Sequence, residues 1–324
     1  MKLLDSFDRS HTYLRISVTD RCNFRCVYCL PEEGLQWTPK SQILSYEEIA
    51  RLVHIFADMG IRKIRITGGE PTMRADICHL VSSLCQIKGI EEVNMTTNGY
   101  TLPKLAAPLR KAGLHKINVS LDTLDPEVFK TLSRGFSIAP VRKGLAEAKK
   151  LGFHIKINAV LLKDINEDSL FPLIEYCAEN QFVLRFIEYM PFDARWHTCL
   201  SNREIRQRIL QRYTLQPTLH NTQTAGPAQN EWLVETQSKV GFISPLSNRF
   251  CHSCNRLRLS AKGELRTCLA HEDTQSLGTM LRSSASDEQI AQQIRTQVWG
   301  KQEGHFCEEE SGTLFEGVMT RIGG

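Results

Sequence analysis

The chain has 324 residues, of which 41% are hydrophobic and 23% are charged, and its formal net charge is +4. These values suit a globular protein with one large domain or two fused parts, and the charge is too small to indicate a nucleic-acid-binding protein. Neither a secretory leader nor an apolar run of about 18 residues is visible, so we expect a cytoplasmic protein without a membrane-spanning helix. In that reducing compartment, 11 cysteines indicate metal binding or catalysis more than disulfides.

Short apolar segments alternate with amphipathic segments over residues 1–190. The expected strands are Leu14–Val18, Ile64–Thr67, Val93–Thr96, Ile117–Leu121, Ile155–Leu161 and Val183–Glu188. The clearest helix between them is Ser45–Met59, where Ser45 and Glu48 form a predicted capping box. Six strands alternating with helices predict a parallel α/β sheet, and their even spacing favours an incomplete (βα)6 TIM-like barrel over an open doubly wound sheet.

The pattern changes after Met190, which divides the chain into an expected partial barrel (1–190) and a C-terminal region (191–324). In the second part we expect a loop at Pro217–Asn230, a hairpin formed by Trp232–Glu235 and Val240–Ile243, and a helix at Asp287–Val298. Because no flexible linker separates the two parts, we expect the C-terminal region to pack on the barrel as a layer and to close it.

A first cysteine triple, Cys22, Cys26 and Cys29, directly follows the first expected strand. Strand C-terminal ends are where βα-barrel enzymes build their sites. Three thiolates are one short of the four that close a tetrahedral site or fully ligate a cubane cluster, so one metal position is left open. A zinc site with His11 as a fourth ligand is the structural alternative, although the three-then-two spacing fits zinc poorly.

A second triple consists of Cys251, Cys254 and Cys268 and has histidines and arginines nearby in sequence. His252 or His271 could complete a zinc site here. If the residues that follow Cys254 form a strand, Arg256 and Arg258 lie on the same face of it. Two arginines beside an incompletely ligated metal indicate an anion-binding pocket.

The first triple, with Tyr28, resembles the signature of radical S-adenosylmethionine (SAM) enzymes. Gly68-Gly69-Glu70-Pro71, directly after the strand Ile64–Thr67, resembles the glycine-rich SAM motif of the same enzymes. The resemblance implies a 4Fe-4S cluster on the first triple, whose fourth iron chelates the amino and carboxylate groups of SAM.

Closer still is the resemblance to the GTP 3′,8-cyclase family of molybdenum cofactor biosynthesis. It rests on the run Ser17–Cys26, the segment Cys251–Cys268 and the terminal Gly323-Gly324, and it extends over essentially the whole chain. It implies an incomplete barrel closed by the C-terminal part, and a second 4Fe-4S cluster whose open iron binds guanine. It also implies radical formation from SAM, abstraction of hydrogen from C3′ of GTP, and bond formation between C3′ and C8.

The resemblance also implies roles for individual residues. The expected SAM contacts are Tyr28, Gly69, Ser120 and Met190. The expected GTP contacts are Arg15, Arg65, Thr96, Lys156, Arg185, Arg256, Leu257 and Arg258. Gly323 and Gly324 are expected to reach the active site. Further partners are an external one-electron reductant and, downstream, the cyclic pyranopterin monophosphate synthase; a homodimer is compatible with this assignment, which does not fix the oligomeric state.

Two other classes of function stay open. One is a zinc-bearing binding protein in which both triples are structural. The other is a peptide-modifying radical enzyme whose second cluster only transfers electrons. The cyclase interpretation makes a geometric prediction: both triples face one cavity, on the order of 15 Å apart, within a barrel whose strand ends form the site.

Overall fold

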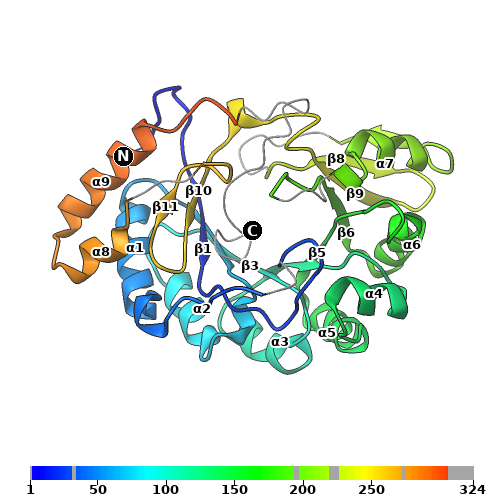
Figure 1. The fold of residues 1–324 in the computed structure, drawn as a ribbon, viewed down its shortest axis with the longest axis horizontal. Helices are drawn as coiled ribbons and strands as arrows, with labels where there is room; N and C mark the ends of the chain where they lie inside the picture. The colour runs from blue at the N-terminus through cyan, green and yellow to red at the C-terminus, as the bar shows by residue number, and fades with distance from the viewer. Residues whose placement is uncertain (1, 31–33, 193–196, 219–225, 272–274, 306–324) are drawn as a thin grey trace.

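A single mixed sheet organises the molecule. The computed structural model describes residues 2–30, 34–192, 197–218, 226–271 and 275–305. Within these residues, eleven strands follow one another in the order β11-β10-β1-β2-β3-β4-β5-β6-β9-β8-β7. The sheet curves around an interior, and the helices lie along its outer side (Figure 1).

The first six strands form the predicted incomplete barrel. They are β1 (Tyr13–Ser17), β2 (Lys63–Thr67), β3 (Glu92–Thr97), β4 (Lys116–Ser120), β5 (His154–Ala159) and β6 (Val183–Ile187). Each pairs in parallel with the next, which confirms the predicted parallel α/β architecture. The helices around them are α1 (Tyr46–Asp58), α2 (Ile77–Cys85), α3 (Leu102–Lys111), α4 (Pro126–Ser133), α5 (Ala139–Lys150) and α6 (Leu170–Asn180).

Helix α1 shows how local sequence fixes these elements. Ser45 accepts a hydrogen bond from the Glu48 amide, and the Glu48 carboxylate accepts one from the Ser45 amide, so the predicted capping box is present. Ile49, Leu52 and Phe56, spaced three and four residues apart, are fully buried against the sheet. The helix ends at Asp58, two residues before Gly60, which has the positive φ of 109° that glycine tolerates best.

The last third of the chain extends the sheet at both edges. Its elements are α7 (Asn202–Ile209), β7 (Leu215–Pro217), β8 (Gln229–Leu233), β9 (Ser238–Ile243), β10 (Arg256–Leu259), β11 (Leu265–Arg266), α8 (Leu277–Arg282) and α9 (Asp287–Trp299). Strand β9 pairs in parallel with β6, and β10 pairs in parallel with β1. The expectation of a separate layer was therefore wrong: these strands satisfy the edge hydrogen bonds that β1 and β6 would otherwise expose.

Two smaller expectations for this region were close. The predicted hairpin is β8 and β9, but β8 begins at Gln229, inside the segment expected to be a loop. Helix α9 covers the predicted Asp287–Val298 and one further residue. The proposed domain boundary at residue 190 stays a prediction, since strands from both sides of it share one sheet. No helix within the described ranges combines the length and apolar character needed to cross a membrane.

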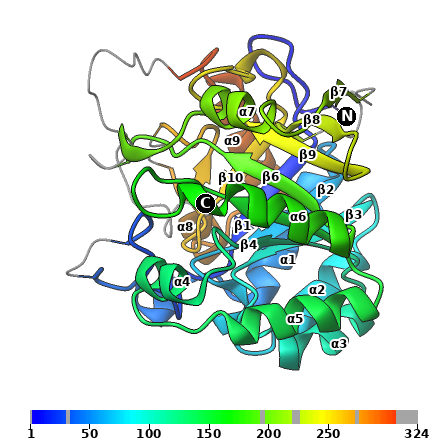
Figure 2. The same ribbon diagram turned by 90° about the vertical axis from the view of Figure 1, so that its right-hand side faces the viewer.

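Close helix packing outside the barrel gives a test of the fold. Helices α3 and α5 lie side by side (Figures 1 and 2), and Gly144 of α5 faces α3. A methyl group at Gly144 would lie 2.6 Å from Leu102 Cβ and 2.9 Å from Gly99 O.

We expect Gly144→Ala to lower the free energy of unfolding by about 1–3 kcal/mol through overpacking, although alanine improves helix propensity by about 1 kcal/mol. Urea denaturation followed by circular dichroism measures the change. Gly300→Ala is the matched control, because its φ is −78° and its nearest neighbours lie 3.7 Å from the added methyl. Equal stabilities of the two variants would contradict the packing argument.

Candidate active site

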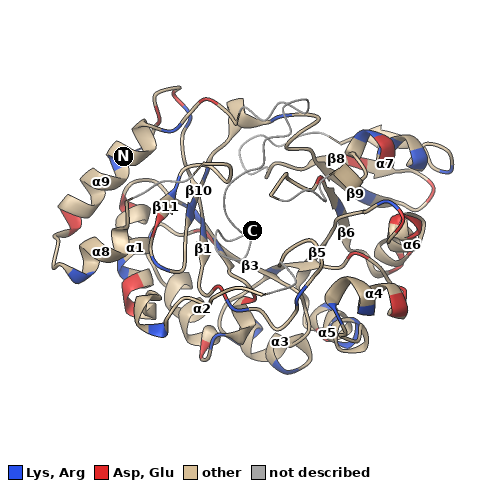
Figure 3. Cartoon of the chain, in the orientation of Figure 1, with Lys and Arg blue, Asp and Glu red and all other residues tan. Residues whose placement is uncertain are grey.

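Polar side chains occupy one face of the parallel strands. Successive side chains in a strand point to opposite faces, and the outer face carries the aliphatic core, such as Leu14 and Ile16 on β1. The inner face carries the residues Tyr13, Arg15, Lys63, Arg65, Asn94, Thr96, Asn118, Ser120, Lys156, Asn158, Arg185, Arg256 and Arg258. Figure 3 marks the Lys and Arg positions along β1 and β10 in blue.

Arginines occupy neighbouring positions on this face. In the sheet register, Arg15 lies between Arg65 on β2 and Arg258 on β10. Arg65 donates from Nε to the Tyr13 hydroxyl and from Nη1 to Thr96 Oγ1 at 3.4 Å. Arg65, Arg185 and Arg258 are only 7%, 9% and 8% exposed. Strand pairing therefore places Arg15, Arg65 and Arg258, which lie far apart in sequence, side by side.

The inner face carries several positive charges close together and favours binding of an anion. Burial, together with Arg65, lowers the pKa of Arg185 to about 10, and burial with Arg15 and Arg256 lowers that of Arg258 well below its usual range. Arg185 Nε has no hydrogen-bond partner within the described residues. Buried guanidinium groups remain charged and repel one another, so bound negative charge would stabilise the arrangement.

Lys156 adds a group that responds to such a ligand. Burial, followed by Arg185, Lys63 and Arg65, lowers the pKa of the Lys156 ammonium to about 7. The lysine is thus about half neutral near pH 7 in the ligand-free protein. A bound polyanion would restore its proton, because a nearby opposite charge favours the ionised form.

Lys63 and Lys116 extend the cationic face and were missed by the sequence analysis. Both contact the Glu92 carboxylate, Lys63 at 2.5 Å. Burial opposes ionisation of Glu92, but Lys116 and Lys63 outweigh it and lower the pKa to about 2. The signal was present in the sequence, since Lys63 stands two residues before Arg65 and shares its face.

Not every expected GTP or SAM contact has a side chain on this face. Leu257 is fully buried in the aliphatic core, on the face of β10 opposite Arg256 and Arg258. Only its backbone can therefore meet a ligand at the inner face. Ser120 ends β4 and Met190 follows β6, so both lie at the C-terminal ends of strands. Gly323 and Gly324 lie outside the described residues.

The first cysteine triple forms a compact loop after β1. The amides of Cys29 and Leu30 both donate to the carbonyl of Cys26, at 2.9 and 3.1 Å. Phe24 anchors the loop, because its ring packs against Tyr100, Phe129 and Phe136 with centroids 4.7–5.8 Å apart. Asn98, after β3, donates from Nδ2 toward Cys22 Sγ at 3.8 Å.

Carboxylates are the charged side chains that, besides the cysteines themselves, shift the pKa values of the first triple. Burial, with Glu70 and then Cys29, raises the pKa of Cys22 to about 12, and burial with Asp122 raises that of Cys29 to about 11. These thiols therefore stay protonated at neutral pH unless a cation replaces their protons. Three adjacent half-buried thiols of this kind fit a metal cluster, whose binding releases protons.

The glycine-rich segment is folded tightly against the loop. The Gly69 amide donates to Thr19 O at 2.6 Å, and a Cβ on Gly69 would lie 2.5 Å from Asp20 O. Glu70 is 1% exposed, and its carboxylate accepts from the Asn98 amide at 2.6 Å and the Thr97 hydroxyl at 2.7 Å. Gly69 thus permits close backbone approach, while Glu70 ties the ends of β2 and β3 together.

Asp122 is a second site residue that the sequence analysis missed. It accepts a 2.5 Å hydrogen bond from the Tyr28 hydroxyl and a 2.9 Å bond from the Val160 amide. Tyr189 donates to the Tyr28 carbonyl at 2.7 Å. Burial raises the pKa of Asp122 to about 6 despite these hydrogen bonds. Tyr28 is therefore held from both its side chain and its backbone.

The second triple lies at the opposite end of the strands. Cys251 and Cys254 flank a short turn before β10, and Cys268 follows β11. Burial alone would raise the pKa of Cys254, but Arg256 and Lys301 outweigh it and lower the pKa to about 6. Cys254 is therefore mostly a thiolate at neutral pH before any metal binds. A thiolate is the form of cysteine that binds metals.

Strand register sets the order of the two triples along the sheet. Strand β10 runs parallel to β1 with Arg256 opposite Tyr13, so the second triple precedes these strands and the first follows them. The five-residue strand β1 that lies between them is about 17 Å long at a rise of 3.3 Å per residue. No group of three or more His, Cys, Asp or Glu within the described ranges forms a single-ion site.

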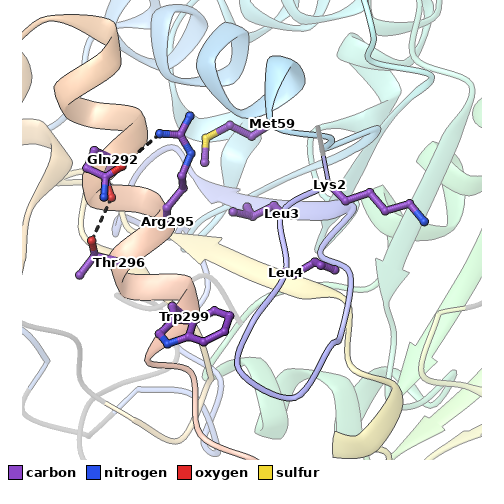
Figure 4. Close-up of a pocket in the computed structure, with 8 residues that line it drawn as sticks. All are labelled: Lys2, Leu3, Leu4, Met59, Gln292, Arg295, Thr296 and Trp299. Atoms are coloured by element: carbon purple, nitrogen blue, oxygen red, sulfur yellow. Dashed lines mark hydrogen bonds between the residues drawn. The ribbon is translucent and has the colours of Figure 1, made fainter.

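The best-defined pocket lies away from this face. A hollow of about 400 Å³ opens between the N-terminal residues 2–4 and α9 (Figure 4), and it is lined by Lys2, Leu3, Leu4, Met59, Gln292, Arg295, Thr296 and Trp299. It lacks convergent buried polar groups, whereas ligand sites in βα barrels lie at strand ends. The charged inner face is therefore the stronger candidate.

Two family models match the chain, one after the other. The model described as radical SAM superfamily matches residues 16–177, and the model described as Molybdenum Cofactor Synthesis C matches residues 182–307. Among solved structures, Streptococcus suis SuiB bound to S-adenosylmethionine has a TM-score of 0.61 at 18% identity, with coverage of 90% of this chain and 69% of that one. That similarity supports the fold.

Several curated relatives match nearly the whole chain. The GTP 3′,8-cyclase of Paracoccus denitrificans (strain Pd 1222) is 42% identical, over 94% of this chain and 89% of that protein. The GTP 3′,8-cyclase of Pseudomonas putida (strain W619) is 41% identical, over 99% and 98%. Molybdenum cofactor biosynthesis protein 1 of Drosophila melanogaster is 42% identical over 94% of this chain, which spans 54% of that longer protein.

The barrel and the first family match define a radical SAM enzyme, which depends on S-adenosylmethionine and an iron–sulfur centre. With relatives above 40% identical over nearly its full length, the chain belongs to the GTP 3′,8-cyclase family. The thiols of the first triple fit the iron–sulfur centre that this class requires.

The buried Asp122 carboxyl makes the stability of the cluster-free protein depend on pH. Its folded pKa of about 6 lies above the ordinary aspartate value of 3.8. Below pH 4 both states are protonated, and between pH 4 and 6 the unfolded state ionises first, so the folded state loses stability as pH rises. Above pH 6 the loss is constant, with an upper limit of about 3 kcal/mol.

We expect Asp122→Asn to remove this loss, so that the variant gains stability relative to the parent protein as pH rises from 4 to 6. Urea unfolding at several pH values measures the difference. Asp58→Asn, which alters an exposed carboxylate on α1, serves as the control. Parallel stability profiles for the parent and Asp122→Asn would contradict the assigned burial effect.

Proposed function

We propose that the protein is a GTP 3′,8-cyclase that converts GTP to (8S)-3′,8-cyclo-7,8-dihydroguanosine 5′-triphosphate, the first step of molybdenum cofactor biosynthesis. One observation carries the proposal: a face of buried and half-buried arginines and lysines runs between two cysteine triples in a chain of this family. A triphosphate carries the several negative charges that such a face requires.

Two [4Fe-4S] clusters would occupy the two triples. Cys22, Cys26 and Cys29 would hold the first, and Cys251, Cys254 and Cys268 the second. When bound, the first cluster and SAM supply the one-electron chemistry that generates a carbon radical. The protein's own residues bind, orient and neutralise the substrate.

The residues around the first triple are proposed to bind SAM. Gly69 lets the glycine-rich segment pack against the backbone of residues 20 and 21, beside the first triple, where the methionyl group would bind. Tyr28, held by Asp122 and Tyr189, is placed to contact adenine. Ser120 and Met190, at the ends of β4 and β6, would complete this site.

The residues of the inner face are proposed to bind GTP. Arg256 and Arg258 lie beside the second triple, where guanine would be held. Arg15, Arg65, Thr96, Lys156 and Arg185 would contact the ribose and phosphates, and the backbone of Leu257 would contribute. Gly323 and Gly324 are proposed to approach the bound nucleotide.

Further partners follow from the same proposal. The reaction needs an external one-electron reductant, and its product would pass to the cyclic pyranopterin monophosphate synthase. We propose a cytoplasmic location. We also propose a homodimer, which a measurement of the oligomeric state in solution would test. A peptide-modifying radical enzyme is the second candidate, because SuiB, also solved with its precursor peptide SuiA, shares the fold at a TM-score of 0.63 and 18% identity.

Anaerobic reconstitution with iron and sulfide tests the cofactor content and the reaction together. We expect about eight iron and eight sulfide ions per chain, and about four of each after alanine replaces the three cysteines of either triple. With reductant and SAM, GTP should stimulate 5′-deoxyadenosine formation. Zinc without sulfide supports a structural metal protein, and cleavage of SAM that ignores GTP supports a peptide-modifying enzyme.

In the same assay, Arg256→Lys and Arg258→Lys should each lower kcat/KM for GTP by about tenfold or more, because lysine lacks the planar fork of arginine. Arg295→Lys, on the exposed side of α9, is the control. Unchanged kcat/KM in the first two variants would contradict their assignment to GTP.

GTP binding should take up a proton at Lys156. With a ligand-free pKa of about 7, this lysine is mostly neutral at pH 8, so binding should absorb roughly 0.9 proton per GTP. The phosphates are fully ionised at pH 8 and do not contribute. Affinity should therefore fall as pH rises above 7.

Calorimetry of the reconstituted protein with GTP, in two buffers of different ionisation enthalpy and without reductant, measures the uptake. Lys156→Met should remove that share of the uptake and leave only the contribution of Tyr13, whose pKa of about 8 also allows it to gain a proton. Lys104→Met, on the outer helix α3, should leave the uptake unchanged. Absence of uptake in the parent protein would show that Lys156 does not meet the triphosphate.

A further inference from the structure

Residues near both ends of the described chain contact the loop of the second cysteine triple. Residues 3–11, here called the N-terminal arm, run past Cys251, and residues 301–304, here called the α9 exit, follow helix α9. The Arg9 guanidinium donates to the carbonyls of Cys251 at 2.9 Å, Gln302 at 2.7 Å and Glu303 at 2.6 Å. Arg9 thus joins the arm, the cysteine loop and the α9 exit.

Arg9 and the groups that it contacts, here called the Arg9 clasp, are buried or partly buried, and the positive charge of Arg9 is paired with the negative charge of Asp5. Arg9 is 8% exposed, and its Nε donates to the fully buried Asp5 carboxylate at 2.6 Å. His11, also fully buried, lies 3.0 Å from the same carboxylate. Asp5 therefore serves Arg9 and His11. Because the Arg9 guanidinium donates to three carbonyls in two separate segments, it fixes the position of the cysteine loop relative to the α9 exit.

Lys301, at the α9 exit, is the other buried cation here. It is 3% exposed, and its hydrogen-bond acceptors within the described residues are Cys254 Sγ at 3.5 Å and Arg256 O at 3.1 Å. A buried ammonium requires an anionic partner, and a peptide carbonyl supplies only a dipole. The sulfur of Cys254 is the group in contact that can carry full negative charge.

We propose that Lys301 is a positioning residue for the second cluster, whose ammonium donates a hydrogen bond to the Cys254 sulfur while the Arg9 clasp holds the cysteine loop in place. The proposal rests on the proposed function, because it requires a cluster on this triple. Hydrogen bonds and positive charge at ligand sulfurs favour the more reduced cluster and raise its reduction potential. Lys301 would set that potential without touching the substrate.

The test compares the reduction potentials of both clusters in reconstituted full-length protein. Electron paramagnetic resonance titrations follow each cluster, and replacing Cys22, Cys26 and Cys29 by alanine isolates the signal of the second. We expect Lys301→Met to shift the second cluster to a more negative potential and to leave the first unchanged. Lys262→Met removes an exposed lysine paired with Glu264 at 2.8 Å and should shift neither.

The iron count separates the two possible failures. If the parent protein binds only about four iron ions, the proposed second cluster is wrong. If it binds about eight and Lys301→Met leaves both potentials unchanged, the role of Lys301 is wrong while the proposed function stands.

If Lys301→Met loses the second cluster altogether, Lys301→Arg distinguishes a charged hydrogen bond from simple packing. Restoration of the cluster and of its potential by arginine supports the charged hydrogen bond. Failure of arginine to restore either one assigns Lys301 to packing alone and overturns the proposal. Arg9→Lys, which loses the fork but keeps the charge, should reduce iron incorporation at the second triple only.

Discussion

The burial of several like charges on one face of the sheet is the constraint on which the rest of the structure depends. In a filled βα barrel, branched aliphatic side chains pack the interior in layers. Here Arg15, Arg65 and Arg258 stand side by side in the register, and the apolar half of each strand faces the helices instead. Stability therefore comes from the outer face, which leaves the inner face to bind a polyanion.

The C-terminal third contributes to this site by joining the sheet. Strand β10 pairs with β1 although the two are about 240 residues apart in sequence, and this pairing places Arg256 and Arg258 next to Tyr13 and Arg15. A separate layer would have placed them outside the barrel. The same pairing positions the second triple at the beginning of these strands and the first triple beyond their ends, so that the cationic face lies between the two.

Local signals made much of this fold predictable from the sequence. Strand alternation located the six parallel strands within about two residues, and the Ser45–Glu48 box located the start of α1. Long-range contacts were not predictable. Asp122 and Tyr28 are 94 residues apart, and Arg9 and Cys251 are 242 apart. Leu257 shows a different limit, because its family position indicates a contact that its buried side chain does not make.

The two triples differ most in the charge around them. Glu70 and Asp122 raise the pKa values of the first set of thiols after burial has done so, whereas Arg256 and Lys301 lower that of Cys254 against burial. Nearby carboxylates disfavour the addition of an electron to a bound cluster, and nearby cations favour it. A low potential at the first triple suits reductive cleavage of SAM. A higher one at the second triple would suit the proposed second cluster, which would hold the substrate and take no part in that cleavage, so the charges around the two triples fit two different tasks.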